Sequence, residues 1–318
     1  MSPNINHSLK IAVINGGSSA EASVSRLSAK SVIEALKKNY TLVESIELDS
    51  DLTQRLETFS PDIVLPILHG PPGEDGTLQG YLEILGHEYI GSGVHASSIA
   101  MDKVFAKQVF AAAGLPLAKQ QVYTDSQHIP LYVDEILNRL GKEVVVKPAT
   151  QGSTLGITLV EDENTLHQAL KTAFEFDDKV LIEERVFGRE ITVAVLDTDE
   201  GPIALPIIDI VTKDDVFYDF EHKYTEGLSE HIVPADMSEE QSQRLRDYAI
   251  KAHLALGCRD LSRADFIVPN ENEEILLEVN TLPGMTPASL YPDAARAHGL
   301  SFEALMQHFV ERALKRKA

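Results

Sequence analysis

Hydrophobic residues in the first ninety positions alternate between short continuous runs and helical spacing. The runs at 11–14 and 63–68 have the length and apolar character of buried strands. Between them, apolar residues recur every three or four positions over 24–36, which predicts a helix. This succession is typical of an open, mostly parallel sheet with helices on its faces, although Pro66 argues against a fully central position for the second strand. Ligands of such sheets bind beyond the carboxyl ends of the strands.

The pattern changes after about residue 93. A helix is expected at 104–113, because its apolar stripe ends at Gly114 and Pro116 follows soon after. The next elements expected are strands at 144–147, 157–160 and 180–184, with a helix at 166–174. Together they predict a compact α+β unit.

The last segment begins near residue 188. The elements expected in it are a strand at 191–196, a polar loop at 213–236, a helix at 245–256, strands at 264–268 and 275–279, and a final amphipathic helix at 302–313. We therefore expect an N-terminal α/β domain (1–92), a central domain (93–187) and a C-terminal domain (188–318).

Composition narrows the class of partner. The chain has 318 residues, of which 43% are hydrophobic and 24% are charged, as in an ordinary globular protein. Lys and Arg number 28 against 49 Asp and Glu, and the net charge of −21 argues against a nucleic acid or an anionic membrane as partner. Cys258 is the single cysteine, so no disulfide within the chain is possible and a reducing cytoplasm is expected. We expect its side chain to be buried in the core rather than to act as a nucleophile. Residues 1–10 contain no apolar signal segment, and no apolar run approaches the roughly 18 residues of a membrane span.

Two carboxylates and an amide near the C-terminal end form the sharpest candidate site. If 264–268 and 275–279 pair as antiparallel strands, Asp265 and Glu278 can face each other, and Asn280 shares the face of Glu278. Such oxygen ligands suit Mg²⁺, whereas two opposed carboxylates without a cation would repel. The competing interpretation is a solvated hairpin rim, and the apolar residues around Glu278 favour the metal site.

A lysine and a glycine-rich loop suggest phosphate binding. Lys147 ends an apolar strand, and the loop at 151–156 follows it. Backbone N–H groups of such a loop can bind phosphate oxygens while a lysine neutralises their charge. No Walker A motif occurs in the chain.

Three further features remain ambiguous from the residues alone. Glu183 and Glu184 end a strand, and either belong to a polar linker or contact a nucleotide. His69 follows a strand beside a Gly/Pro loop, and is either a packed residue or a functional one. Residues 91–96 match a dinucleotide fingerprint, but no acidic residue follows at 111–117. We therefore interpret them as a loop between domains and do not expect NAD or FAD binding.

Several strings together resemble one family. They are Asn15-Gly-Gly-Ser-Ser-Ala-Glu21, His69-Gly70 with Gly73-Glu-Asp-Gly76, Met101-Asp-Lys103, Val146-Lys-Pro148 with Gly152-Ser153, and Glu278-Val-Asn-Thr-Leu-Pro-Gly-Met-Thr286. From about residue 10 to 314 the chain resembles the D-alanine–D-alanine ligases, which are ATP-grasp enzymes. The resemblance implies a three-domain ATP-grasp fold and ATP-dependent joining of two D-alanines through an acyl phosphate. It also implies a place in peptidoglycan synthesis, cell-wall biogenesis and cell shape, two Mg²⁺ ions with Mn²⁺ able to substitute, and a cytoplasmic homodimer.

The resemblance also implies roles for individual residues. For ATP these are the phosphate lysines Lys103, Lys147 and Lys223, Ser153 of the glycine-rich loop, the adenine-contacting stretch Glu183, Glu184 and Val186, and the ribose-binding Glu190. For metal they are Asp265, Glu278 and Asn280. For the amino acids, the resemblance implies that Glu21 and His69 lie near the first substrate and that Ser289 and Leu290 lie near the second. It implies that Glu21, Ser153 and Tyr224 close the site. It also implies that Arg263 and the Gly284 N–H stabilise the oxyanion.

Some positions depart from the family pattern. Thr154, Leu155, Pro71, Pro72, Pro287, Ala288 and Asp293 differ from the residues common in the family. These positions flank the second substrate's pocket and the phosphate loop and bear on fine specificity, whereas Tyr224 resembles the dipeptide-forming type. The alternatives are another ATP-grasp ligase, such as one that makes a D-alanyl depsipeptide, and a non-catalytic nucleotide-binding protein.

Overall fold

The N-terminal strands form a parallel sheet. The structure is a computed structural model, and it describes residues 6–19, 21–152, 155–213, 227–269 and 273–317. The sheet has the order β2-β1-β3, with β1 (Lys10–Asn15) between β2 (Leu42–Glu47) and β3 (Ile63–Pro66). The helices of this region are α1 (Ala22–Leu36), α2 (Leu52–Phe59) and α3 (Thr77–Ile84). The expected parallel sheet is confirmed, and the strand that contains Pro66 lies at one end of it.

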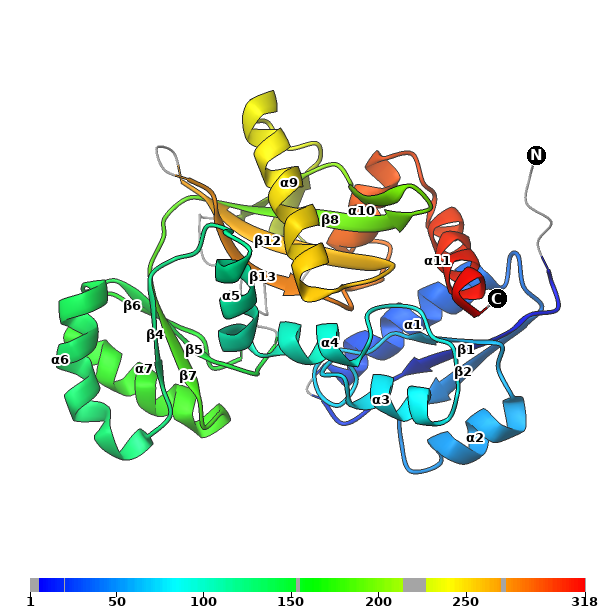
Figure 1. The fold of residues 1–318 in the computed structure, drawn as a ribbon, viewed down its shortest axis with the longest axis horizontal. Helices are drawn as coiled ribbons and strands as arrows, with labels where there is room; N and C mark the ends of the chain where they lie inside the picture. Colours follow the sequence, from blue (N-terminus) through cyan, green and yellow to red (C-terminus); the bar gives the residue numbers. More distant parts are fainter. Residues whose placement is uncertain (1–5, 20, 153–154, 214–226, 270–272, 318) are drawn as a thin grey trace.

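A second sheet is antiparallel and lies at the opposite end of the molecule (Figure 1). Its order is β4-β7-β5-β6, formed by β4 (Gln120–Tyr123), β7 (Val180–Glu184), β5 (Val144–Pro148) and β6 (Thr158–Val160). Its other elements are η1 (Ser126–His128), α6 (Ile129–Leu140) and α7 (Glu163–Phe176). One face packs on α6 and α7 through Val144, Val146 and Ile182. Because side chains alternate along a strand, Lys147 and Glu183 lie on the other face.

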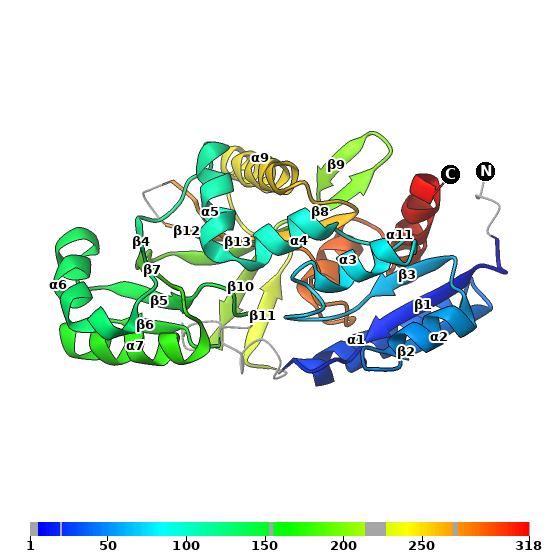
Figure 2. The same cartoon turned by 60° about the horizontal axis from the view of Figure 1, so that its bottom comes forward.

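The third sheet lies between the other two along the long axis (Figure 2). Its order is β11-β10-β8-β12-β13, and β9 pairs with β8. The strands are β8 (Arg189–Thr198), β9 (Gly201–Ala204), β10 (Ile208–Thr212), β11 (Ser229–Ile232), β12 (Leu261–Val268) and β13 (Ile275–Asn280). The helices that pack around this sheet are α4 (Val94–Met101), α5 (Lys103–Ala112), α9 (Glu239–Leu256), α10 (Leu290–Ala297) and α11 (Phe302–Lys317). Helix α9 ends at Gly257, whose φ of 71° is the left-handed value expected of a C-cap glycine.

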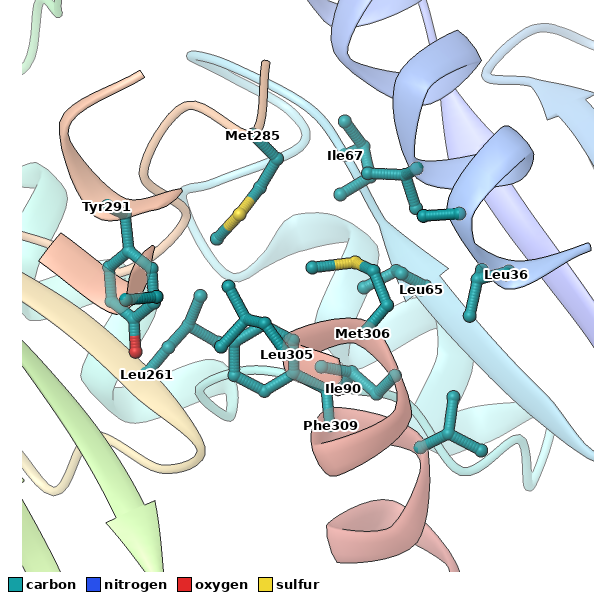
Figure 3. Packing of buried hydrophobic residues seen from close by; sticks show 14 of the residues in the cluster. Leu36, Leu65, Ile67, Ile90, Leu261, Met285, Tyr291, Leu305, Met306 and Phe309 are labelled. Carbon is teal, nitrogen blue, oxygen red and sulfur yellow. The ribbon is translucent and has the colours of Figure 1, made fainter. Parts of the chain in front are cut away.

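The central strand β8 separates two apolar clusters. Ile191, Val193 and Val195 face α5 and α9, whereas Ala194 and Leu196 face α10 and α11. The second of these clusters continues into the N-terminal sheet, where Leu36, Leu65 and Ile67 pack beside Met306 and Phe309 of α11 (Figure 3). The first and third sheets therefore share one core.

Two segments differ from the sequence-based expectations. Residues 229–232, expected as loop, form β11, because their backbone pairs with Asp209–Thr212 of β10 in antiparallel register. Residues 94–96, expected as part of a loop, begin α4. Helices α4 and α5 pack into the cluster of the third sheet through Ala96, Ala106 and Phe110. The expected domain limits at 92/93 and 187/188 stay a prediction.

None of the described helices is both long and apolar enough to cross a membrane.

Candidate functional site

A cavity of about 1220 Å³ lies where loops of the first sheet meet the third sheet and the start of α5. Of the residues expected in the site, those that line it are Glu21, His69, Lys103, Arg263, Glu278, Asn280, Gly284, Ser289 and Leu290. Those that are described but lie off its lining are Lys147, Glu183, Glu184, Val186, Glu190 and Asp265. Ser153, Lys223 and Tyr224 lie outside the described residues.

The strand pair β12–β13 has the register expected from the sequence. Asp265 is opposite Glu278, and Arg263 is opposite Asn280. The Asp265 carboxylate, only 8% exposed, accepts hydrogen bonds from Arg263 Nε (2.9 Å) and Nη2 (2.7 Å) and from Asn280 Nδ2 (3.0 Å). Thr192 Oγ1 of β8 also donates to it at 2.6 Å. Arg263, Thr192 and two of the candidate metal ligands, Asp265 and Asn280, therefore form one network.

The start of α5 is tied to the glycine-rich loop. Lys103 Nζ donates to the Gln151 carbonyl at 2.5 Å and lies 4.0 Å from a Glu278 oxygen, and its backbone N–H donates to the Ala149 carbonyl. Asp102 caps the helix by accepting from the backbone N–H groups of Val104 and Phe105. These contacts place an ammonium group between the glycine-rich loop and Glu278 of β13.

A buried carboxylate, Glu183 of β7, lies between lysines of α5 and β5. Glu183, 2% exposed, has its two oxygens 2.6 Å from Lys107 Nζ and 2.6 Å from Lys147 Nζ. Burial raises the pKa of Glu183, but the two ammonium groups outweigh it and hold that pKa at about 2. Burial also lowers the pKa of Lys147, and Glu183 more than reverses this, so the pKa of Lys147 is raised.

Glu183 and Glu184 point to opposite faces of β7. The Glu184 carboxylate pairs with Lys119 at 3.1 Å, away from Lys147. Glu190 lies on β8 and contributes to the raised pKa of Lys147, whereas Val186 is partly exposed between the two strands. The two adjacent glutamates therefore have different surroundings.

Three ionisable groups gather at the carboxyl ends of the N-terminal strands. Glu21 and His69 are buried, and Glu74 Oε2 accepts from the Gly70 N–H at 2.6 Å. Burial raises the pKa of Glu74 to about 7 and lowers the pKa of His69. Gly152 of the loop lies next to this group, since a Cβ there would be in van der Waals contact with a Glu21 oxygen at 3.7 Å.

Residues on the approach to α10 form the far wall of the cavity. Ser289 begins the helix as its N-cap residue, and its Oγ accepts from the Thr286 N–H at 3.1 Å. A Cβ at Gly284 would lie only 3.0 Å from that Oγ. Asp293 of α10 is hydrogen-bonded to His231 Nδ1 of β11 at 2.7 Å, which joins the wall to the third sheet.

Glu74 and Lys107 were not predicted from the sequence as site residues. Glu74 lies in the loop after β3 and lines the cavity. It belongs to the Gly73–Gly76 motif, so the motif could have indicated it as a site residue. Lys107 follows Lys103 by one helical turn among buried apolar residues, which is the only trace it leaves in the sequence.

The comparisons with known proteins agree along almost the whole chain. Residues 47–92 match the family model described as D-ala D-ala ligase N-terminus, and residues 109–311 match D-ala D-ala ligase C-terminus. The D-alanine–D-alanine ligase of Halalkalibacterium halodurans is 46% identical over 97% of this chain and 100% of its own length. The ligase of Bacillus anthracis complexed with ATP superposes with a TM-score of 0.83 at 32% identity, covering 97% of this chain and 98% of that one. The VanG D-Ala:D-Ser ligase of Enterococcus faecalis gives 0.81 at 30% identity, covering 96% and 99%.

The fold and these matches define the class of protein as an ATP-grasp ligase. The chain belongs to the D-alanine–D-alanine ligase family and is an enzyme. The resemblance, fold class and enzyme class inferred from the sequence are confirmed.

Proposed function

We propose that this protein joins two D-alanine molecules into D-alanyl-D-alanine, with conversion of ATP to ADP and phosphate, for peptidoglycan precursor synthesis. In the proposed reaction the carboxylate of the first D-alanine attacks the γ-phosphate, and the amine of the second attacks the resulting acyl phosphate. The observation that carries the proposal is that Glu21, Lys103 and Arg263, from separate parts of the chain, line one cavity. Family membership supports the reaction class.

Divalent metal would be held by Asp265, Glu278 and Asn280. Two carboxylates and an amide oxygen are hard ligands that suit Mg²⁺, and Mn²⁺ accepts the same set. Within the described residues no three His, Cys, Asp or Glu side chains gather closely enough to hold a metal by themselves. Mg²⁺ keeps several water and phosphate oxygens when it binds few protein ligands, so this donor set fits such an ion, which would withdraw charge from the phosphates. We propose two of them.

Cationic side chains of this chain bind and orient the nucleotide in the proposed mechanism. Lys103 and Lys147 neutralise the phosphate oxygens, together with Lys223 and the loop at Ser153. Glu183 accepts from the adenine amino group, while Glu184 and Val186 contact the base on the same stretch, and Glu190 binds the ribose. The proximity of Lys103 to the Gln151 carbonyl supports the placement of the phosphate chain at this loop.

Other residues hold the amino acids. Glu21 binds the ammonium of the first D-alanine with His69 beside it, and Ser289 and Leu290 hold the second. Arg263 and the Gly284 N–H stabilise the tetrahedral oxyanion, which is where a preorganised donor lowers the barrier most. Glu21, Ser153 and Tyr224 close the site, since water must be excluded from a hydrolysable acyl phosphate.

Release of ADP with D-alanine as the sole amino acid tests the proposal. We expect turnover that requires a divalent cation, and loss of more than about 100-fold in Glu278→Gln, because removal of a metal ligand weakens charge stabilisation in the transition state. Glu47→Gln, on a partly exposed strand end outside the cavity, is the matched control and keeps activity. Absence of D-alanine-dependent turnover contradicts the proposed reaction, and an active Glu278→Gln contradicts the metal assignment.

The second substrate is tested separately. The VanG relative acts on D-serine, and His231 with Asp293 adds a polar pair to the wall of this cavity. Competition among D-alanine, D-serine and D-lactate for the second position should favour D-alanine. Preference for either competitor would indicate a ligase of the same class with a different second substrate.

We further propose that the protein is a cytoplasmic homodimer. Sedimentation equilibrium tests the proposed dimer.

A further inference from the structure

Lys107 is the most deeply buried of the three lysines Lys103, Lys107 and Lys147. It is 1% exposed and lies on α5 one helical turn after Lys103, with Ala106 and Phe110 as buried neighbours. Its ammonium group contacts Glu183 Oε1 at 2.6 Å and the Leu276 carbonyl of β13 at 3.5 Å. Lys107 therefore lies in the protein interior, with its ammonium group directed at Glu183 and β13.

Glu183 receives its two cationic partners from different directions. Lys147 lies on the neighbouring strand β5, on the same face of the sheet as Glu183, and donates to Oε2 at 2.6 Å. Lys107 approaches Oε1 from α5, which packs over that face beside the Val104, Ala149 and Leu181 cluster. Lys147 is 12% exposed at its side chain, so it alone of the two lysines can turn toward a ligand.

The two contacts are equally short. Lys147 Nζ lies 2.6 Å from Oε2 and Lys107 Nζ lies 2.6 Å from Oε1, so each carboxylate oxygen has its own cationic partner. Glu183 therefore keeps one partner when the other is lost.

We propose that Lys107 is a positioning residue for nucleotide binding, which acts by keeping the buried Glu183 carboxylate charge-compensated when Lys147 turns to the phosphates. The inference rests on the proposed function, in which Lys147 binds phosphate and Glu183 binds adenine. The physical reason is that a buried carboxylate that loses its only cationic partner is strongly destabilised. With Lys107 in place, the release of Lys147 leaves one partner behind. Without Lys107, Glu183 holds Lys147 and the nucleotide must compete for it.

The first test is calorimetric titration of the full-length protein with ATP and Mg²⁺ in the absence of D-alanine. Lys107→Met should weaken ATP binding by at least about tenfold, whereas Lys107→Arg, which keeps the charge, should stay within about threefold of the unchanged protein. In steady-state assays we expect the loss as a raised KM for ATP with kcat changed less than twofold. An unchanged dissociation constant in Lys107→Met overturns the inference.

The second test separates positioning from general stability. Lys107→Met combined with Glu183→Gln removes both charges, so its ATP dissociation constant should equal that of Glu183→Gln alone. If the combined variant binds at least tenfold more weakly than Glu183→Gln, Lys107 does not act through Glu183 and the inference fails. This comparison remains decisive even if Lys107→Met alone does not fold.

A control breaks an ion pair in which only the carboxylate is buried. Arg244→Met removes the partner of Glu274, which is 1% exposed and lies off the cavity lining, at an Nη2 to Oε1 distance of 2.9 Å. It should lower the melting temperature and leave ATP affinity unchanged. ATP binding without D-alanine turnover would contradict the proposed function only, whereas equal ATP affinity of Lys107→Met and the unchanged protein would contradict the role of Lys107 only.

Discussion

Glu74 illustrates how burial sets the charge of a single side chain in the cavity. Its oxygen accepts from the Gly70 N–H, an interaction that favours the ionised form, yet burial outweighs it and raises the pKa to about 7. The neighbouring Glu21 and Glu278 act in the same direction. Near neutral pH this carboxyl therefore changes protonation state. The Gly73–Gly76 motif by itself does not predict this raised pKa.

The raised pKa predicts a pH-dependent stability. Because the folded value of about 7 exceeds the ordinary value of 4.5, proton binding stabilises the fold below pH 4.5, and this contribution is lost as pH rises through 7. Between pH 5.5 and 8 the protein should lose up to about 2 kcal/mol relative to Glu74→Gln, which does not titrate. Urea unfolding of both proteins in chelator at the two pH values measures the difference. A pH-independent difference contradicts the prediction.

At the scale of elements, α11 connects distant parts of the chain. Arg316 at its end contacts Asp260 (2.5 Å) before β12, Glu88 (2.9 Å) after α3 and the Tyr89 carbonyl (2.9 Å). Asp260 is fully buried, so its carboxylate depends on this guanidinium and on the N–H of Gly91. The helix thus joins the first and third sheets through charge as well as through its apolar stripe.

Arg316→Met tests this connection. The substitution leaves Asp260 buried with its cation removed, which should cost about 3–5 kcal/mol of unfolding free energy. Lys315→Met is the control, because the Lys315 and Asp199 side chains are 57% and 64% exposed, and its loss should stay below about 1 kcal/mol. Denaturant unfolding of both variants provides the measurement, and equal losses would show that burial of Asp260 does not determine the cost.

At the scale of the whole molecule, the core is divided unequally. The first and third sheets share a cluster that runs from β1 and α1 to α10 and α11, whereas the second sheet has its own cluster with α6 and α7. The net charge of −21 belongs to this scale too, because it describes the surface as a whole. The cavity itself has local cations in Lys103 and Arg263, so the acidic balance does not oppose one nucleotide with its metal.

The divided core predicts a selective response to cavity-forming substitutions. Phe309→Ala, at a position 1% exposed, should cost about 3–5 kcal/mol and speed amide hydrogen exchange in β1, β3 and β8. Exchange in β5 and β7 should stay unchanged. Ile136→Ala in α6 is the matched control and should give the reverse pattern. Uniform acceleration in both variants would indicate a single cooperative core.

The sequence predicted the elements whose signal is local. The alternation of side chains and the short connection were sufficient for the β12–β13 pair, so Asp265 was expected opposite Glu278. Strand β11 was missed because its hydrophobic signal is weak, and only pairing with β10 makes it a strand. Helix α5 was predicted, but its packing partner depends on contacts with residues far along the chain.

By itself, the sequence determined the parallel N-terminal sheet, the reaction class through the family resemblance of its motifs, and nine of the residues that line the cavity. These features follow from periodicity and from strings of neighbouring residues. Only the tertiary structure decided that Glu183 is buried between Lys107 and Lys147 while Glu184 faces the other side. The physical reason is that burial and charge pairing depend on distances between separate segments, and no local pattern encodes them.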